Sequence, residues 1–248
     1  MVPTPSADTF AALARSSPWR WSTLRFTVSW AEDRWTTGAV RAWLRRPDLL
    51  RVEELDGALL QVVRDAPDGN RVVPVLRPDG LVASRPAPWA SGTDAPMYQN
   101  YHWVAMLDPA ELADGMDPDT DRTVPGADVE SVAEVEHGGR PAWEAAVRPT
   151  AAYEPRCGCC SLLRCRAVDL VEYRDHPEHV LAAYPDAYRV RLDVGTGVCV
   201  LTEQIGGLTP GKGHDVRIEA VDEPMDDGLF SVPPRRPFRR RSGWSPFR

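Results

Sequence analysis

The chain has 248 residues, of which 43% are hydrophobic and 26% charged, and its formal net charge is −7. A chain of this length buries roughly 70–75% of its unfolded surface, so it needs no disulfides to hold a core. The apolar content excludes wholesale disorder. No stretch approaches the ~20 apolar residues of a membrane-spanning helix, so we expect no transmembrane segment.

Positive charge is concentrated at the C-terminal end. Residues 235–248 contain six arginines and no acidic residue, and without those six the remaining 23 basic residues face 36 acidic ones, a net charge of −13. An acidic body disfavours binding to phosphate backbones, so we expect no specific nucleic-acid partner. We expect the segment 235–248 to be a disordered tail, with docking of a protein partner as its alternative role.

The first residues, MVPTPSADTF, contain neither the basic start nor the apolar core of 7–15 residues that a secretory signal requires. We therefore expect a cytoplasmic protein. The five cysteines are an odd count, which argues against a complete disulfide framework.

Alternation of apolar and polar residues is the dominant pattern, and it predicts β-strands with one apolar face. In 22–30, for example, Leu24, Phe26, Val28 and Trp30 share one face. Short connections between consecutive strands predict antiparallel pairing, because a parallel crossover needs a dozen or more residues. The expected strands are 22–30, 38–45, 49–55, 58–65, 71–77, 128–137, 141–149, 188–194, 198–205 and 214–221.

The middle of the chain predicts helices. Residues 97–107 lack turn signals and carry apolar residues at helical spacing, and Asp108 is placed to cap a second short helix that starts at Pro109. We predict an α+β fold, in which helices cover the concave apolar face of one strongly curved antiparallel sheet. The expected domain spans 1–234, with a cysteine-containing insertion at about 150–187.

The order of these elements resembles the LolA-like family, which comprises outer-membrane lipoprotein carriers and related sensors. The resemblance covers roughly residues 10–233 and rests on short stretches in a common order. These are WSTLRFTVSW (21–30), WLRRPDLLRVEEL (43–55), GGRPAWEAAVRP (138–149), YRVRLDVGTGVCVLTEQIGG (188–207) and VDEPMDDGLFSVP (221–233). The resemblance implies a half-barrel with an internal apolar cavity, in a family whose classical members carry acyl chains or sense exported lipoproteins.

From this fold we expect a non-enzymatic protein that binds a hydrophobic or lipid-like ligand, such as an acyl chain, in the half-barrel cavity. No pattern of nucleophile, acid and base suited to catalysis is evident in the sequence. Aromatic and aliphatic side chains suit the lining of such a cavity. The residues expected to line it are Phe26, Val28, Trp30, Trp43 and Trp103.

A cysteine cluster supports a second function, that of a metal- or redox-responsive regulatory or interaction module. The stretch 157–165 reads CGCCSLLRC, and His176 and His179 follow it. Zinc takes four nitrogen or sulfur ligands in a tetrahedron, so zinc is the cofactor that Cys157, Cys159, Cys160 and Cys165 would bind, with the two histidines as further candidate ligands. A disulfide between Cys157 and Cys160, or a group of structural thiols, are the alternatives. Sequence alone leaves the three open.

Overall fold

The computed structural model describes residues 3–31, 38–64, 73–85 and 96–232. The expected tail 235–248 lies outside the described residues, as do the first two residues of the expected strand 71–77. Within the described part, the α-helices are α1 (Ala7–Arg20), α2 (Tyr101–Leu107) and α3 (Arg166–Glu172). Short 3-10 turns lie at η1 (Ala110–Leu112), η2 (Gly158–Cys160), η3 (Pro177–His179) and η4 (Asp227–Phe230).

Nine strands form one antiparallel sheet, in the order β4-β3-β2-β1-β13-β12-β11-β10-β9. The N-terminal strands of this sheet are β1 (Thr23–Ala31), β2 (Val40–Arg45), β3 (Leu49–Glu54) and β4 (Leu59–Arg64). The C-terminal ones are β9 (Ala127–His137), β10 (Arg140–Pro149), β11 (Ala187–Asp193), β12 (Cys199–Ile205) and β13 (Gly213–Val221). Two small two-stranded sheets pair β5 (Val75–Leu76) with β6 (Val82–Ser84) and β7 (Asp114–Met116) with β8 (Thr123–Pro125).

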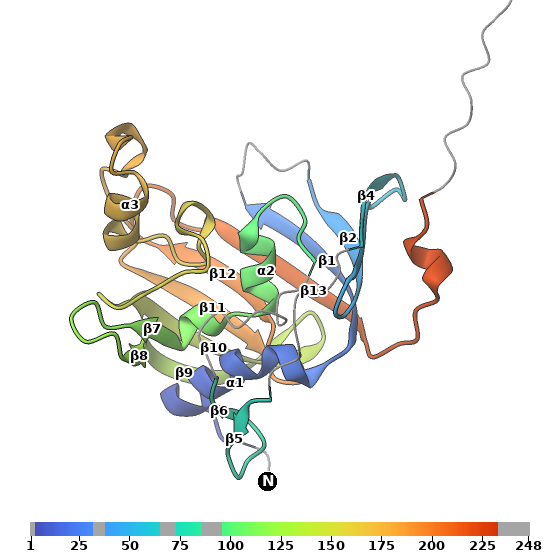
Figure 1. The fold of residues 1–248 in the computed structure, drawn as a ribbon, viewed down its shortest axis with the longest axis horizontal. Helices are drawn as coiled ribbons and strands as arrows, with labels where there is room; N and C mark the ends of the chain where they lie inside the picture. Colours follow the sequence, from blue (N-terminus) through green and yellow to red (C-terminus); the bar gives the residue numbers. More distant parts are fainter. Residues whose placement is uncertain (1–2, 32–37, 65–72, 86–95, 233–248) are drawn as a thin grey trace, which may run out of the picture.

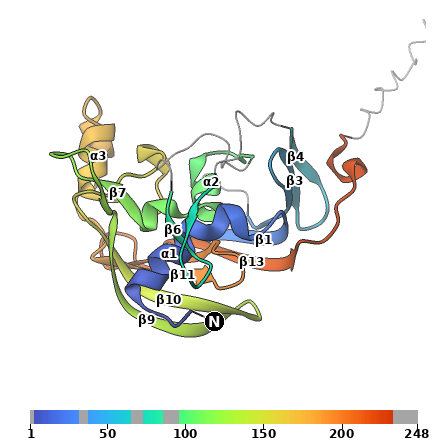
Figure 2. The ribbon, with the colours of Figure 1, turned by 60° about the horizontal axis from the view of Figure 1, so that its bottom comes forward.

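The sheet is strongly curved, and α1 and α2 lie inside its curve (Figures 1 and 2). The predicted α+β class, with a curved antiparallel sheet and helices on the concave face, is confirmed. Two meanders, β1 to β4 and β9 to β13, are joined where β1 pairs with β13, with Val28 opposite Val216. Strands at opposite ends of the sequence therefore lie at the centre of the sheet.

Helix α1 starts at a capping box, in which the Ser6 side chain accepts from the Thr9 backbone N–H and the Thr9 hydroxyl accepts from the Ser6 N–H. Its buried side includes Phe10 and Leu13. The helix backbone packs directly on the turn between β11 and β12, where a Cβ on Gly197 would lie 2.6 Å from the Leu13 carbonyl oxygen. Glycine at that position lets the helix approach the sheet closely.

The expected second helix after Asp108 is wrong. Only the three residues of η1 are helical there, and the strand β7 follows at once. Asp108 ends α2 instead of starting a helix, because its fully buried carboxylate accepts hydrogen bonds from the guanidinium groups of Arg85 and Arg156. A side chain engaged by two arginines is not available to cap backbone N–H groups.

Candidate metal-binding site

The side chains predicted to line a ligand cavity form part of the protein core. Phe26, Val28 and Trp103 are 0%, 1% and 1% exposed. The ring of Trp103 lies 5.3 Å from that of Phe26 and 5.3 Å from that of Tyr98, centroid to centroid, and 6.5 Å from that of the half-buried Trp30. Rings at these spacings are in packing contact. Phe26, Val28 and Trp103 are therefore packed in the core.

Trp43 lies on the other face of the sheet, which corrects the prediction that it joins this lining. In β2, Val40, Ala42 and Leu44 are buried and alternate with half-buried residues. Trp43 pairs with Arg25 of β1, whereas Phe26 pairs with Ala42. Since neighbouring residues of a strand point to opposite faces, Trp43 and Phe26 cannot contact the same ligand.

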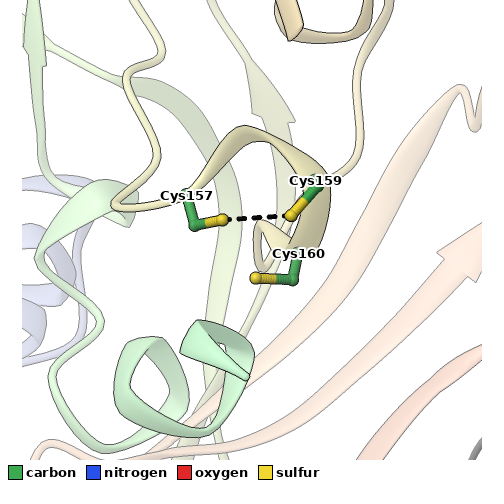
Figure 3. Close-up of side chains that lie close together, drawn as sticks. All are labelled: Cys157, Cys159 and Cys160. Carbon is green, nitrogen blue, oxygen red and sulfur yellow. Dashed lines mark hydrogen bonds between the residues drawn. The ribbon is translucent and has the colours of Figure 1, made fainter. Parts of the chain in front are cut away.

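Three of the predicted metal ligands converge in the insertion between β10 and β11. The Sγ atoms of Cys157, Cys159 and Cys160 all lie within 4.8 Å of one another, on and next to the turn η2 (Figure 3). The Sγ atoms of Cys157 and Cys159 are 3.2 Å apart. Within the described ranges this is the one group of three or more cysteine, histidine or acidic residues with such geometry.

The turn that gathers the thiols depends on Gly158. A Cβ at this position would lie 2.5 Å from the Oε2 atom of Glu172, which belongs to α3. The absence of a side chain lets the turn rest against α3. The Glu172 carboxylate is therefore placed beside the cluster, as a neighbouring negative charge that would favour a bound cation.

Cys165 does not join the cluster, although the sequence places it only five residues after Cys160. It stands at the N-cap of α3 and packs against the core. His176 and His179 also remain apart from the thiols. Their rings lie 6.0 Å from each other, and the Nδ1 atom of His176 is 3.3 Å from the Glu178 carboxylate. The predicted four-cysteine set is thus reduced to three.

The structure holds all five cysteines as thiols, so the alternative disulfide between Cys157 and Cys160 is not formed in it. Burial raises the pKa of Cys159 and of Cys160, and the neighbouring Cys157 thiol adds to this by hydrogen bonding and by charge. Thiols with a raised pKa are poor nucleophiles and slow participants in disulfide exchange. The raised pKa values therefore count against rapid disulfide exchange at Cys159 and Cys160.

Glu111 ties both ends of the cysteine loop to the protein body. Its buried carboxylate accepts the Leu162 N–H at 2.8 Å, the Arg156 N–H at 3.3 Å and the hydroxyl of Tyr153. Arg156 and Leu162 flank the segment 157–161, so one carboxylate closes that segment into a loop. Burial raises the pKa of Glu111, and these hydrogen bonds oppose the shift.

The sequence analysis did not identify Glu111, which follows the expected helix cap Asp108 by three residues. A glutamate beside an expected cap is ordinarily solvent-exposed. Its burial follows from the shortness of η1 and from the return of the chain at 153–162, and neither is visible in the local sequence.

No family model matches the sequence, and no curated protein matches it. Three solved structures resemble the fold: MucB, MucB in complex with MucA(peri), and the MucA/MucB complex of Pseudomonas aeruginosa. The identities are 15%, 14% and 13%, and the TM-scores are 0.43, 0.42 and 0.40. The alignments cover 92% of this chain in each case and 62%, 60% and 61% of the others, so this chain spans about three fifths of their length.

At these identities and TM-scores, the comparisons do not show that this chain belongs to the LolA-like family. In two of the three structures MucB is bound to MucA, which is a property of MucB. The expected cytoplasmic location is withdrawn as a correction, because the structures found, which are of MucB and of MucB with MucA(peri), do not support it.

Among the helices of the described residues, none has the length and apolar character needed to cross a membrane.

Proposed function

We propose that this protein is a non-enzymatic binding module that holds a thiophilic metal ion, with zinc as the leading candidate, through Cys157, Cys159 and Cys160. The observation that carries the proposal is the convergence of three sulfur atoms within 4.8 Å on one short turn. Thiolates are soft ligands that select zinc and copper(I) over magnesium or calcium. Three cysteines within four residues also bring the ligands together at little cost in chain entropy.

Three protein ligands leave one position of a zinc tetrahedron open. Cys159 is exposed, and Cys157 and Cys160 are half-buried, so the open position is accessible to water or to a side chain of another protein. The loop is held at both ends by Glu111, which limits the rearrangement that binding requires. These features support a regulatory or interaction module whose surface changes with metal occupancy.

The hydrophobic-ligand function receives less support. It requires an open apolar cavity on the concave face. Phe26 and Trp103, the residues expected to line that cavity, are buried against each other instead.

The test is to measure metal binding to reduced protein. Wild-type protein would be titrated with zinc in competition with a chromophoric chelator, and with cobalt(II), whose thiolate complexes absorb in the near ultraviolet. We expect one equivalent to bind, and we expect Cys159→Ser to weaken binding at least tenfold. Cys165→Ser is the matched control, since this thiol lies in the same insertion but outside the cluster.

Absence of saturable binding to the wild type, or equal affinity in the wild type and Cys159→Ser, would refute the proposal. A preference for copper(I) over zinc at the same three thiols would support the site and identify a different ion. Loss of binding in Cys165→Ser as well would show that the fourth cysteine moves into the site.

A further inference from the structure

His102 connects the cysteine insertion to the centre of the sheet. It lies on α2, and its Nδ1 atom is 3.1 Å from the carbonyl oxygen of Ser161, the residue that follows Cys160. Its Nε2 atom is 3.0 Å from the Nδ1 atom of His214 on β13. The two rings meet edge to face, with centroids 5.1 Å apart. Both ring nitrogens of His102 therefore have a hydrogen-bond partner.

The protonation state of His214 follows from its own partners. Its Nε2 atom is 2.8 Å from the carbonyl oxygen of Cys199. A carbonyl only accepts, so His214 Nε2 carries a hydrogen. Full burial lowers the pKa of His214 to about 3, so its ring is neutral at ordinary pH. The Nδ1 atom of His214 is consequently an acceptor, which also suits the Thr202 hydroxyl 3.0 Å away.

The protonation state of His102 then follows by elimination. Its Nε2 must donate to the bare Nδ1 of His214, and its Nδ1 must donate to the Ser161 carbonyl. A histidine that donates from both nitrogens is an imidazolium. We infer that His102 is held in its doubly protonated form and that its second proton fastens the cysteine loop to the sheet.

Other ionisable groups around this link are few among the described residues. On β13, Asp215 lies next to His214 and interacts with His137 of β9, whose Nε2 atom is 3.5 Å from the Asp215 carboxylate. The Asp215 carboxylate favours positive charge nearby, whereas a charge on His137 opposes it. Glu111 anchors the same loop at Leu162, one residue beyond Ser161. A neutral His102 keeps one N–H for these two acceptors, so deprotonation breaks the link between the loop and the sheet either at the Ser161 carbonyl or at His214.

The inference deepens the proposed function, since the fastened segment carries the three thiols, and His102 acts on them as a positioning residue. It is tested without metal, so the two proposals can fail separately. The first measurement is the ¹⁵N spectrum of the histidine rings in wild-type protein. We expect both nitrogens of His102 to be protonated near pH 6 while His214 remains neutral with its hydrogen on Nε2. A neutral His102 ring at that pH would overturn the inference.

The second measurement is amide hydrogen exchange at Leu162 and Leu163, corrected for the intrinsic effect of pH. In the wild type we expect protection to fall about tenfold or more as His102 loses its proton, the effect of one hydrogen bond to a charged group. In His102→Gln protection should be low and independent of pH. His179→Gln, an exposed histidine of the same insertion, should behave as the wild type.

Equal protection in His102→Gln and the wild type at every pH would refute the role of His102. If His102→Gln does not fold, the ring spectrum of the wild type together with its own exchange profile decides the question.

Discussion

Replacing Trp103 with alanine distinguishes a packed core from an open ligand cavity. A buried tryptophan removes about 200 Å² from water, which at about 25 cal/mol per Å² stabilises the fold by about 5 kcal/mol. Compactness of the unfolded chain reduces this by a tenth to two fifths. Because Trp103 is 1% exposed and packs on Phe26, Trp30 and Tyr98, we expect Trp103→Ala to lower the free energy of unfolding by about 4 kcal/mol.

The assay is urea unfolding followed by far-ultraviolet circular dichroism, with Trp43→Ala as the control. Trp43 is half-buried on the outer face, so its removal should cost only about 1 kcal/mol. A cost below about 1 kcal/mol for Trp103→Ala would refute the packed core, since truncation at the wall of an open cavity removes few contacts. In that case the hydrophobic ligand would again be the better explanation of the concave face.

Three further predictions concern the thiols, their titration and the turn between β11 and β12. Cys159→Ser should weaken zinc binding at least tenfold while Cys165→Ser leaves it unchanged, as measured by chelator competition. The pKa values of Cys159 and Cys160 are raised, so a metal ion that binds their sulfur atoms must displace their protons. We therefore expect the metal affinity to rise between pH 6 and pH 8, by up to about tenfold per pH unit for each proton released. An affinity that does not change with pH in the same competition assay would contradict this. Asp193→Asn should lower the free energy of unfolding, measured in urea, by about 2 kcal/mol. The reason is that the buried Asp193 carboxylate accepts hydrogen bonds from Arg140 Nε at 2.7 Å and from the Thr196 N–H at 2.8 Å. A decrease below about 0.5 kcal/mol would contradict that role.

Most strands could be predicted because their faces alternate within the local sequence. The expected ranges 128–137, 141–149, 198–205 and 214–221 agree with β9, β10, β12 and β13 to within two residues at each end. Of the expected strand 71–77, residues 73–77 are described, and among these Val75–Leu76 form β5, which pairs with β6 outside the main sheet. A short apolar run does not specify which sheet it joins.

The face of the sheet on which Trp43 lies could have been predicted from the sequence. Val40, Ala42 and Leu44 form the apolar face of their strand, which assigns Trp43 to the opposite face. The prediction placed it by its aromatic character rather than by its position in the alternation. The alternation of residues along a strand could not place Trp103, because Trp103 lies on the helix α2. Its contact with Phe26 of β1 depends on where α2 packs against the sheet.

The sequence showed the cysteine cluster as a motif, but it did not show which of the cysteines belong to the cluster. Sequence spacing cannot distinguish Cys165 from the other three, since a loop of five residues can turn either way. The structure separates them because Leu162 and Leu163 are buried between them and tie the chain to Glu111 and Tyr153.

The sequence by itself determined the class of fold, the direction of strand pairing and the presence of a thiol-rich insertion. These follow from periodicity and composition, which act over a few residues. Only the tertiary structure decided that β1 lies beside β13, that the concave face is filled, and that Glu111 and His102 hold the cysteine loop. Each of these depends on contacts between residues far apart in the chain, and such contacts exist only after the sheet has curved around its helices.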